Sequence, residues 1–313
     1  MPVLSLTGQG MVMSKTPKTT RIGLNCALST PFTKSGAVDL GKLVAHAQWV
    51  LANGCDGITV FGTTGEGASL ALPERYQVLG ALAASGIDMR TKVVAGVSAA
   101  TAHDAVEQAR AAYAMNCRGL LFAPPFYFGN ASDDGLFRFF ATAFEALGKD
   151  LRDVLLYHIP GMTRNAISVA LTQRLLKEFP GAVIGVKDSN GDWAATLERL
   201  TELKGLQILV GDERQLANAV RHGGAGSICG LANIAPDLLR PLVHQGKDDP
   251  RIGEMVNAIL GYSFMSAIKA MIGDRTGDKD WNIMSPPLDA MSAADTRKLA
   301  AKLAAIRNAS KAA

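Results

Sequence analysis

Residues 182–222 read AVIGVKDSNGDWAATLERLTELKGLQILVGDERQLANAVRH and contain the same pattern twice. Each half begins with a short run rich in Val, Ile and Leu and continues with a segment that has the length and spacing of a helix. The short runs are almost continuously apolar, which is typical of strands that are buried on both faces. Such strands occur in parallel sheets that are covered by helices. This stretch therefore predicts two consecutive β/α units.

The same unit recurs along most of the chain. Eight apolar runs are short enough to be strands: Ile22–Leu28, Asp56–Phe61, Lys92–Val97, Arg118–Ala123, Asp153–His158, Ala182–Lys187, Leu206–Gly211 and Ala225–Cys229. A helical pattern follows each run, beginning near Leu40, Pro73, Thr101, Ser132, Ser168, Asp192, Glu213 and Pro236. Eight such units over residues 21–246 predict an α/β fold, a closed (β/α)8 TIM barrel. An open, doubly wound sheet fits less well, because the chain lacks a glycine-rich dinucleotide turn.

Two segments lie outside the predicted barrel. Residues 1–20 are expected to form a flexible N-terminal tail. Residues 247–313 are expected to form a C-terminal helical extension, with helices over Ile252–Ala270 and Ala290–Ala304. We expect this extension to pack on the barrel or on a second subunit rather than to fold as an independent domain.

The composition favours an intracellular enzyme. The chain has 313 residues, of which 48% are hydrophobic and 19% charged, and this supplies a large core and excludes a disordered chain. Four cysteines are too few and too far apart for a disulfide scaffold or a zinc ribbon. Four reduced, buried thiols are the simpler interpretation, and they indicate a cytoplasmic location. The cysteines are Cys26, Cys55, Cys117 and Cys229.

Charge and hydropathy give no sign of a nucleic-acid or membrane partner. The net charge of +4 is not concentrated in a basic stripe, so no nucleic-acid partner is expected. The chain has no uncharged apolar stretch of ~18 residues, so no membrane span is expected. The first 20 residues do not resemble a secretory signal. The histidines lack ligand spacing, so no metal is expected.

Reactive side chains should lie where the predicted strands end, because the active sites of such barrels lie at that face. Lys187 ends one apolar run, where an ammonium loses hydration and the neutral amine is favoured. A neutral lysine is a nucleophile toward ketones and forms Schiff bases. If Lys187 points into the barrel, Asp188 points away from it and the two do not pair. The alternative is a structural lysine that caps the strand or pairs with another carboxylate.

Two other strand ends carry polar groups. Tyr157 ends the preceding strand, where its hydroxyl could shuttle protons, or could simply be a satisfied hydroxyl of the core. The sequence Gly62-Thr63-Thr64-Gly65 combines two hydroxyls with a permissive backbone, which suits a small carboxylate. Taken alone, this segment is equally compatible with an ordinary turn.

Together these motifs resemble the dihydrodipicolinate synthase / N-acetylneuraminate lyase family. The resemblance rests on Gly62–Glu66, on Tyr157-x-x-Pro160 and on Gly185–Ser189, in this order and spacing. Two weaker similarities, Ala27–Phe32 and Gly223–Ile228, extend it from about residue 22 to the C-terminal helices. Members of this family are lyases that form a Schiff base with pyruvate or a related 2-oxo acid. They need no metal and no organic cofactor.

The resemblance implies a role for each matching residue. Lys187 forms the Schiff base, and Tyr157 shuttles protons with Thr63 in its relay. The 2-oxo acid carboxylate is held by Thr64 and by loop amides that include those of Gly62 and Gly65. Tyr127 reaches into the site of a neighbouring subunit, and Ile228 lines the pocket. Family members are commonly tetramers built from dimers, so a homo-oligomer is expected.

Two departures shift the expected substrate. Dihydrodipicolinate synthases carry an arginine shortly after the Tyr-x-x-Pro motif, whereas this chain has Met162 at that place and Arg164 two residues later. Methionine cannot bind a carboxylate as arginine does, although Arg164 could replace it if the loop differs. His158 also stands where asparagine is common. Both changes favour other 2-oxo acid aldolases or dehydratases, such as a 2-keto-3-deoxy sugar acid aldolase or an enzyme like N-acetylneuraminate lyase.

Two hypotheses from other classes stay open. One is a non-catalytic homologue that binds a metabolite through the carboxylate loop, although the presence of both Lys187 and Tyr157 argues against it. The other is a phosphosugar enzyme that uses Gly223–Gly226 as a phosphate cradle, as many barrels do near their last strands.

Overall fold

The computed structural model describes residues 21–309, so the expected tail at 1–20 lies outside the described residues. Within this part of the chain, eight parallel strands close into a barrel in sequence order, and the last strand pairs with the first. The TIM barrel predicted from the sequence is thereby confirmed. The strands are β1 Gly23–Ala27, β2 Gly57–Val60, β3 Val93–Val97, β4 Gly119–Phe122, β5 Val154–His158, β6 Val183–Asp188, β7 Gln207–Val210 and β8 Gly226–Cys229.

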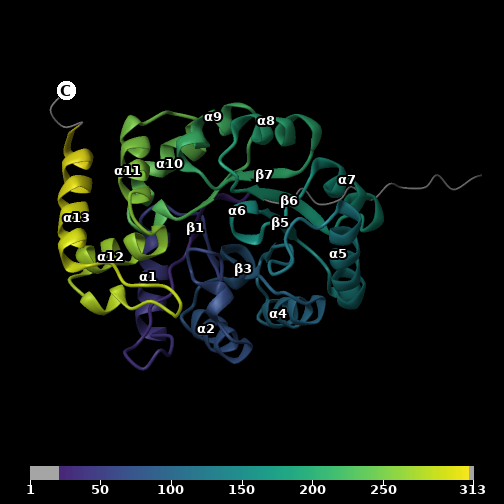
Figure 1. Ribbon diagram of the computed structural model, residues 1–313, viewed down its shortest axis with the longest axis horizontal. Coiled ribbons are helices and arrows are strands. Elements are labelled where there is room, and N and C mark those ends of the chain that lie inside the picture. The colour runs from purple at the N-terminus through teal and green to yellow at the C-terminus, as the bar shows by residue number, and fades with distance from the viewer. Residues whose placement is uncertain (1–20, 310–313) are drawn as a thin grey trace, which may run out of the picture.

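Helices surround the barrel and connect each strand to the next (Figure 1). Several begin at side-chain caps, which satisfy free backbone N–H groups at the helix start. Ser132 and Ser168 accept hydrogen bonds in this way at the starts of α5 and α7. The helices of the barrel are α1 Leu40–Ala52, α2 Leu72–Ala84, α3 Met89–Lys92, α4 Ala102–Ala114, α5 Asp133–Leu147, α6 Pro160–Thr163, α7 Val169–Glu178, α8 Trp193–Glu202, α9 Leu216–Arg221 and α10 Pro236–Gln245.

The C-terminal extension packs beside α1 and α10 at one side of the barrel (Figure 1). Its helices are α11 Pro250–Leu260, α12 Phe264–Thr276 and α13 Ala293–Asn308. The single helix expected over residues 252–270 is wrong, because α11 and α12 meet at an angle of 112°. The apolar pattern runs through the break, since α11 buries one face and α12 is buried continuously over residues 266–273. Two residues mark the break: Gly261 caps the end of α11, and Ser263 is the N-cap of α12.

In residues 21–309, each helix by itself is too short or too polar to cross a membrane. Taken together, the bent pair α11 and α12 has the length and apolar composition of a membrane span.

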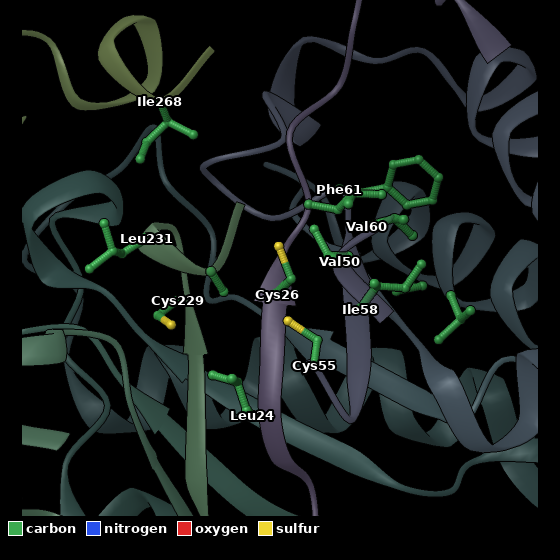
Figure 2. Close-up of a cluster of buried hydrophobic side chains, with 14 of the residues drawn as sticks. Leu24, Cys26, Val50, Cys55, Ile58, Val60, Phe61, Cys229, Leu231 and Ile268 are labelled. Carbon is green, nitrogen blue, oxygen red and sulfur yellow. The ribbon is translucent and has the colours of Figure 1, made fainter. Parts of the chain in front are cut away.

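The main core lies between the outer face of the strands and the helices. Figure 2 shows part of it, where Cys26, Cys55 and Cys229 lie among aliphatic side chains and Ile268 of α12 approaches from the extension. All four cysteines are free and buried, as expected. Burial raises the pKa of the Cys26 and Cys229 thiols well above the usual range, so these two stay protonated.

A second apolar cluster fills the interior of the barrel. On β5, Leu155 and Tyr157 belong to this inner cluster, whereas Val154 and Leu156 belong to the outer core. This alternation follows from the pleat, which turns successive side chains to opposite faces of a strand. The inner cluster also includes Ile228 of β8. Side chains that end these strands on the inner face therefore reach the mouth of the barrel.

Candidate active site

A cavity of about 260 Å³ opens where the strands end, the face at which barrel enzymes place their sites. The loop after β2 and the ends of β3, β4 and β5 form most of its wall. Two segments of the C-terminal extension complete it, Met265 at the start of α12 and the pair Pro287-Leu288. The extension is thus part of the site, which was not expected from the sequence.

A chain of three polar side chains lies at this cavity. The Nζ of Lys187 donates to the hydroxyl of Tyr157 at 3.1 Å, and that hydroxyl lies 3.2 Å from the Oγ1 of Thr63. Tyr157 and Lys187 are paired residues of neighbouring strands, so the sheet register fixes their approach. A phenol between an amine and a second hydroxyl can receive a proton on one side and pass it on at the other.

Lys187 has no carboxylate partner among residues 21–309. Its neighbour Asp188 faces away from the barrel interior, as strand alternation predicts. There the Oδ2 of Asp188 accepts a hydrogen bond from Thr196 at 3.0 Å and lies 3.5 Å from Nη1 of Arg199. The alternative in which Lys187 is neutralised by an acidic residue therefore does not fit the structure.

The buried Arg199 belongs to a layer behind the site that the sequence did not reveal. It donates to the backbone carbonyl of Ile167 at 2.9 Å, while the N–H of Ile167 donates to Nδ1 of His158 at 3.0 Å. Burial, reinforced by the Arg199 cation, lowers the pKa of His158 to about 4. His158 is therefore neutral at pH 7. It anchors the segment after α6 from outside the cavity.

The loop after β2 forms a compact turn. The N–H groups of Gly65 and Gly67 both donate to the carbonyl of Gly62, each at 3.1 Å. A Cβ at Gly67 would overlap the backbone of Phe61, and one at Gly65 would overlap the carbonyl of Leu28. Glycine is therefore required at both positions. This packing presents Thr63 to the cavity and to Tyr157.

Glu66 fixes the end of this loop to the C-terminal extension. Its Oε1 accepts from the Nζ of Lys269 at 2.7 Å, and its Oε2 accepts from the N–H of Ser285 at 2.8 Å. Both charged side chains of this ion pair are 0% exposed. Burial lowers the pKa of Lys269, and the Glu66 carboxylate opposes that shift. A lone lysine in the apolar stretch 264–273 was the one sequence signal for this contact.

The structure brings some of the expected site residues together and leaves others apart. Gly62, Thr63, Tyr157 and Met162 line the cavity, and Lys187 reaches it through Tyr157. Thr64, Gly65 and Ile228 are buried next to the site but do not line the cavity. Residues that line it without having been singled out include Ser69, Ser98, Leu121, Met265, Pro287 and Leu288.

Two expected residues lie outside the cavity. Arg164 caps α6 in a left-handed conformation with φ of 56°, and its side chain packs against Gly129. The structure thus gives no support to the expectation that Arg164 replaces the carboxylate-binding arginine whose place Met162 occupies. Tyr127 is 75% exposed beyond the cavity rim, a position compatible with contact to another subunit.

Two other sequence-based ideas can be compared with the fold. Gly223–Gly226 lies at the amino end of β8, the end of the barrel opposite the cavity, so it cannot cradle a phosphate of a substrate bound there. In the described chain, no three or more His, Cys, Asp or Glu residues are grouped so that they could hold a metal ion.

Comparison with known proteins identifies relatives over almost the whole chain. The model of the dihydrodipicolinate synthetase family matches residues 21–302. An uncharacterized DapA-like lyase of Chloroflexus aurantiacus is 34% identical over 72% of this chain and 76% of its own length. A 4-hydroxy-tetrahydrodipicolinate synthase of Anaeromyxobacter sp. (strain Fw109-5) is 33% identical over 76% of this chain and 77% of its own length.

Solved structures give the same result. A crystal structure of dihydrodipicolinate synthase from Agrobacterium tumefaciens is 44% identical, with a TM-score of 0.89 over 91% of this chain and 99% of that one. A 2-keto-3-deoxygluconate aldolase of Sulfolobus has a TM-score of 0.81 over 92% of this chain and 97% of its own. At 23% identity it indicates the shared fold alone.

Proposed function

Because the chain belongs to the dihydrodipicolinate synthetase family and is a lyase of the Schiff-base type, we propose that Lys187 forms an imine with pyruvate or a related 2-oxo acid. The observation that carries the assignment of Lys187 is its buried contact with Tyr157, which in turn contacts Thr63. An amine without an acidic partner, next to a proton-transfer group, has what imine formation requires.

The proposed reaction begins when the lone pair of Lys187 attacks the ketone carbon of the 2-oxo acid. The ketone oxygen takes a proton from the Tyr157 hydroxyl, and the amine nitrogen returns one through the same hydroxyl. Loss of water then gives the imine. A proton from Tyr157 converts the imine into its protonated form, which withdraws electrons. The Tyr157 oxygen then takes a proton from C3, and an enamine forms. Thr63 passes protons to and from Tyr157, since the two hydroxyls lie 3.2 Å apart.

The carboxylate of the 2-oxo acid is placed on the loop after β2 in this proposal. The hydroxyls of this loop are donors suited to a small anion, and Thr64 is the residue that the resemblance assigns to the carboxylate. The N–H of Gly65 donates to the Gly62 carbonyl at 3.1 Å and is therefore engaged within the loop. The alternative of a non-catalytic binding protein is weaker, since such a protein has no need for the contacts between Lys187, Tyr157 and Thr63. A sugar acid aldolase or an enzyme like N-acetylneuraminate lyase would use the same imine and would differ in the second substrate.

Borohydride reduction tests the imine directly. Incubation with pyruvate and sodium borohydride is expected to add one reduced pyruvate to the peptide that contains Lys187, detected by mass spectrometry after proteolysis. Borohydride without a 2-oxo acid should leave that peptide unchanged. If a panel of 2-oxo acids gives no adduct on Lys187, the proposed function is wrong.

Tyr157→Phe tests the proton relay. The variant removes one oxygen from a packed ring, so we expect folding to be retained while kcat falls by roughly 10²–10⁴-fold, the usual contribution of a positioned acid and base. Proton exchange at C3 of pyruvate, followed by NMR, measures the effect. Tyr113→Phe is the matched control, because its hydroxyl donates to the Arg152 carbonyl far from the cavity. Equal losses in both variants would contradict the relay.

We also propose that the chain forms a homodimer or homotetramer in the cytoplasm. Tyr127 and Phe128 support the assembly, since the two rings pack edge to face at 5.1 Å while 75% and 79% of their surfaces stay exposed. Exposed aromatic pairs of this kind are typical of protein interfaces. The free, buried cysteines support a reducing compartment.

A further inference from the structure

We infer that the second substrate of this enzyme is an uncharged, mainly apolar aldehyde. The inference rests on the proposed imine at Lys187 and concerns the part of the cavity beyond it. Substrate pockets usually combine an apolar wall with a few polar groups that fix orientation. Here Thr63 and Tyr157 lie together at the catalytic end, and much of the remaining wall is apolar. This apolar wall is formed by Leu121, Phe126, Met162, Met265, Pro287 and Leu288.

Apart from Lys187, which carries the imine, no cationic side chain of the described residues lies at the cavity. Its ionisable lining residues are Tyr157 and Glu66, and the Glu66 carboxylate is already neutralised by Lys269 at 2.7 Å. Arg164 packs against Gly129 instead. A carboxylate or phosphate on the second substrate would lose its hydration here without gaining a partner, which is costly in an apolar site. The wall therefore discriminates against an anionic aldehyde.

The cavity offers few hydroxyl partners for a sugar chain. The hydroxyl of Thr163 lies within 3.1 Å of the Ile159 carbonyl and 3.0 Å of the Asn165 carbonyl, so it is occupied within the protein. Ser69 and Ser98 are the remaining hydroxyls of the lining away from the catalytic end. Two serines cannot satisfy a polyhydroxylated chain along an otherwise apolar wall. An aliphatic or aromatic aldehyde fits this surface better than a sugar does.

The reaction that follows is an aldol addition, or its reverse. C3 of the enamine forms a bond to the aldehyde carbon, and the electron pair of the C=O bond moves to oxygen, which takes a proton from Tyr157. Water then adds to the iminium carbon, and the C–N bond breaks. The products are a 4-hydroxy-2-oxo acid with an apolar substituent and the free amine of Lys187.

Two aldehydes of equal chain length provide the test. With pyruvate in excess, we expect kcat/KM for pentanal to exceed that for 5-oxopentanoate by at least about tenfold, a discrimination within the reach of apolar pockets. Glyceraldehyde, the hydroxylated probe, should also be poorer than pentanal. Product is quantified by liquid chromatography and mass spectrometry.

Met162→Arg should reverse the preference by placing a cation at the cavity, raising kcat/KM for 5-oxopentanoate and lowering it for pentanal. Met162→Leu keeps an apolar side chain of similar volume and should keep the wild-type order. Leu260→Arg is the charge control, since it adds the same cation to an exposed position of α11, away from the cavity. This variant should leave kcat/KM unchanged for both 5-oxopentanoate and pentanal.

The outcomes separate this inference from the proposed function. If the borohydride adduct forms on Lys187 but 5-oxopentanoate or glyceraldehyde is preferred, or no aldehyde reacts, the apolar acceptor is wrong and the imine stands. If no adduct forms with any 2-oxo acid, both fail. An adduct together with the expected order of aldehydes supports both.

Discussion

Lys187→Met is expected to abolish turnover, with a loss in kcat of at least roughly 10³-fold, because no other amine of residues 21–309 lies at the cavity to form the covalent intermediate. Methionine has a similar length and tolerates burial, so the barrel interior should stay packed. The borohydride adduct with pyruvate should disappear at the same time. Activity is followed as proton exchange at C3 of pyruvate, and folding by circular dichroism.

Lys204→Met serves as the control for Lys187, because it makes the same substitution at an exposed position outside the site. We expect full activity and an undiminished adduct in this variant. A Lys187→Met protein that still traps pyruvate would show that another lysine carries the chemistry, and the assignment would have to be abandoned.

Breaking the buried pair between Glu66 and Lys269 should have the largest effect on stability. Lys269→Met leaves a buried carboxylate and Glu66→Gln leaves a buried ammonium, so each variant is expected to lose about 3–5 kcal/mol in the free energy of unfolding. The double variant removes both charges and should lose less than the sum of the two single variants. Urea unfolding, with refolding curves to establish reversibility, gives these values.

An exposed ion pair of equal length provides the comparison. Lys42 Nζ also lies 2.7 Å from a carboxylate oxygen, that of Asp278, but both side chains are partly exposed to solvent. Lys42→Met should cost about 1 kcal/mol or less, because water screens such pairs. Similar losses at the two sites would mean that burial does not set the strength of the Glu66–Lys269 contact.

Much of the site could be predicted because its key residues lie at strand ends. Lys187 and Tyr157 each end a recognisable apolar run, and the resemblance to a known family supplied Thr63 as their companion. Alternation along the strand predicted that Asp188 points away from the barrel if Lys187 points into it, and the pairing of Asp188 with Arg199 on the outer face agrees with that prediction. These inferences depend on residues that are close together in the sequence, so they can be made without the tertiary structure.

Other features could not be predicted, because they depend on contacts between distant segments. Glu66 and Lys269 are 203 residues apart, and neither position indicates its partner. The break between α11 and α12 was hidden because the buried apolar residues of α11 are followed closely by the buried segment 266–273 of α12. The role of Arg164 depended on a loop conformation, and the structure directs its side chain to Gly129.

The sequence by itself determined the eight β/α units and the chemistry available at their ends, because burial leaves short continuous apolar runs in the strands and periodic apolar positions in the helices between them. The tertiary structure decided which of those groups meet and what surrounds them. Closure of the barrel and the strand register set Lys187 against Tyr157, and the folding back of the C-terminal extension supplied the apolar wall at Met265. Such contacts arise from packing between segments far apart in the chain, and packing has no local signature.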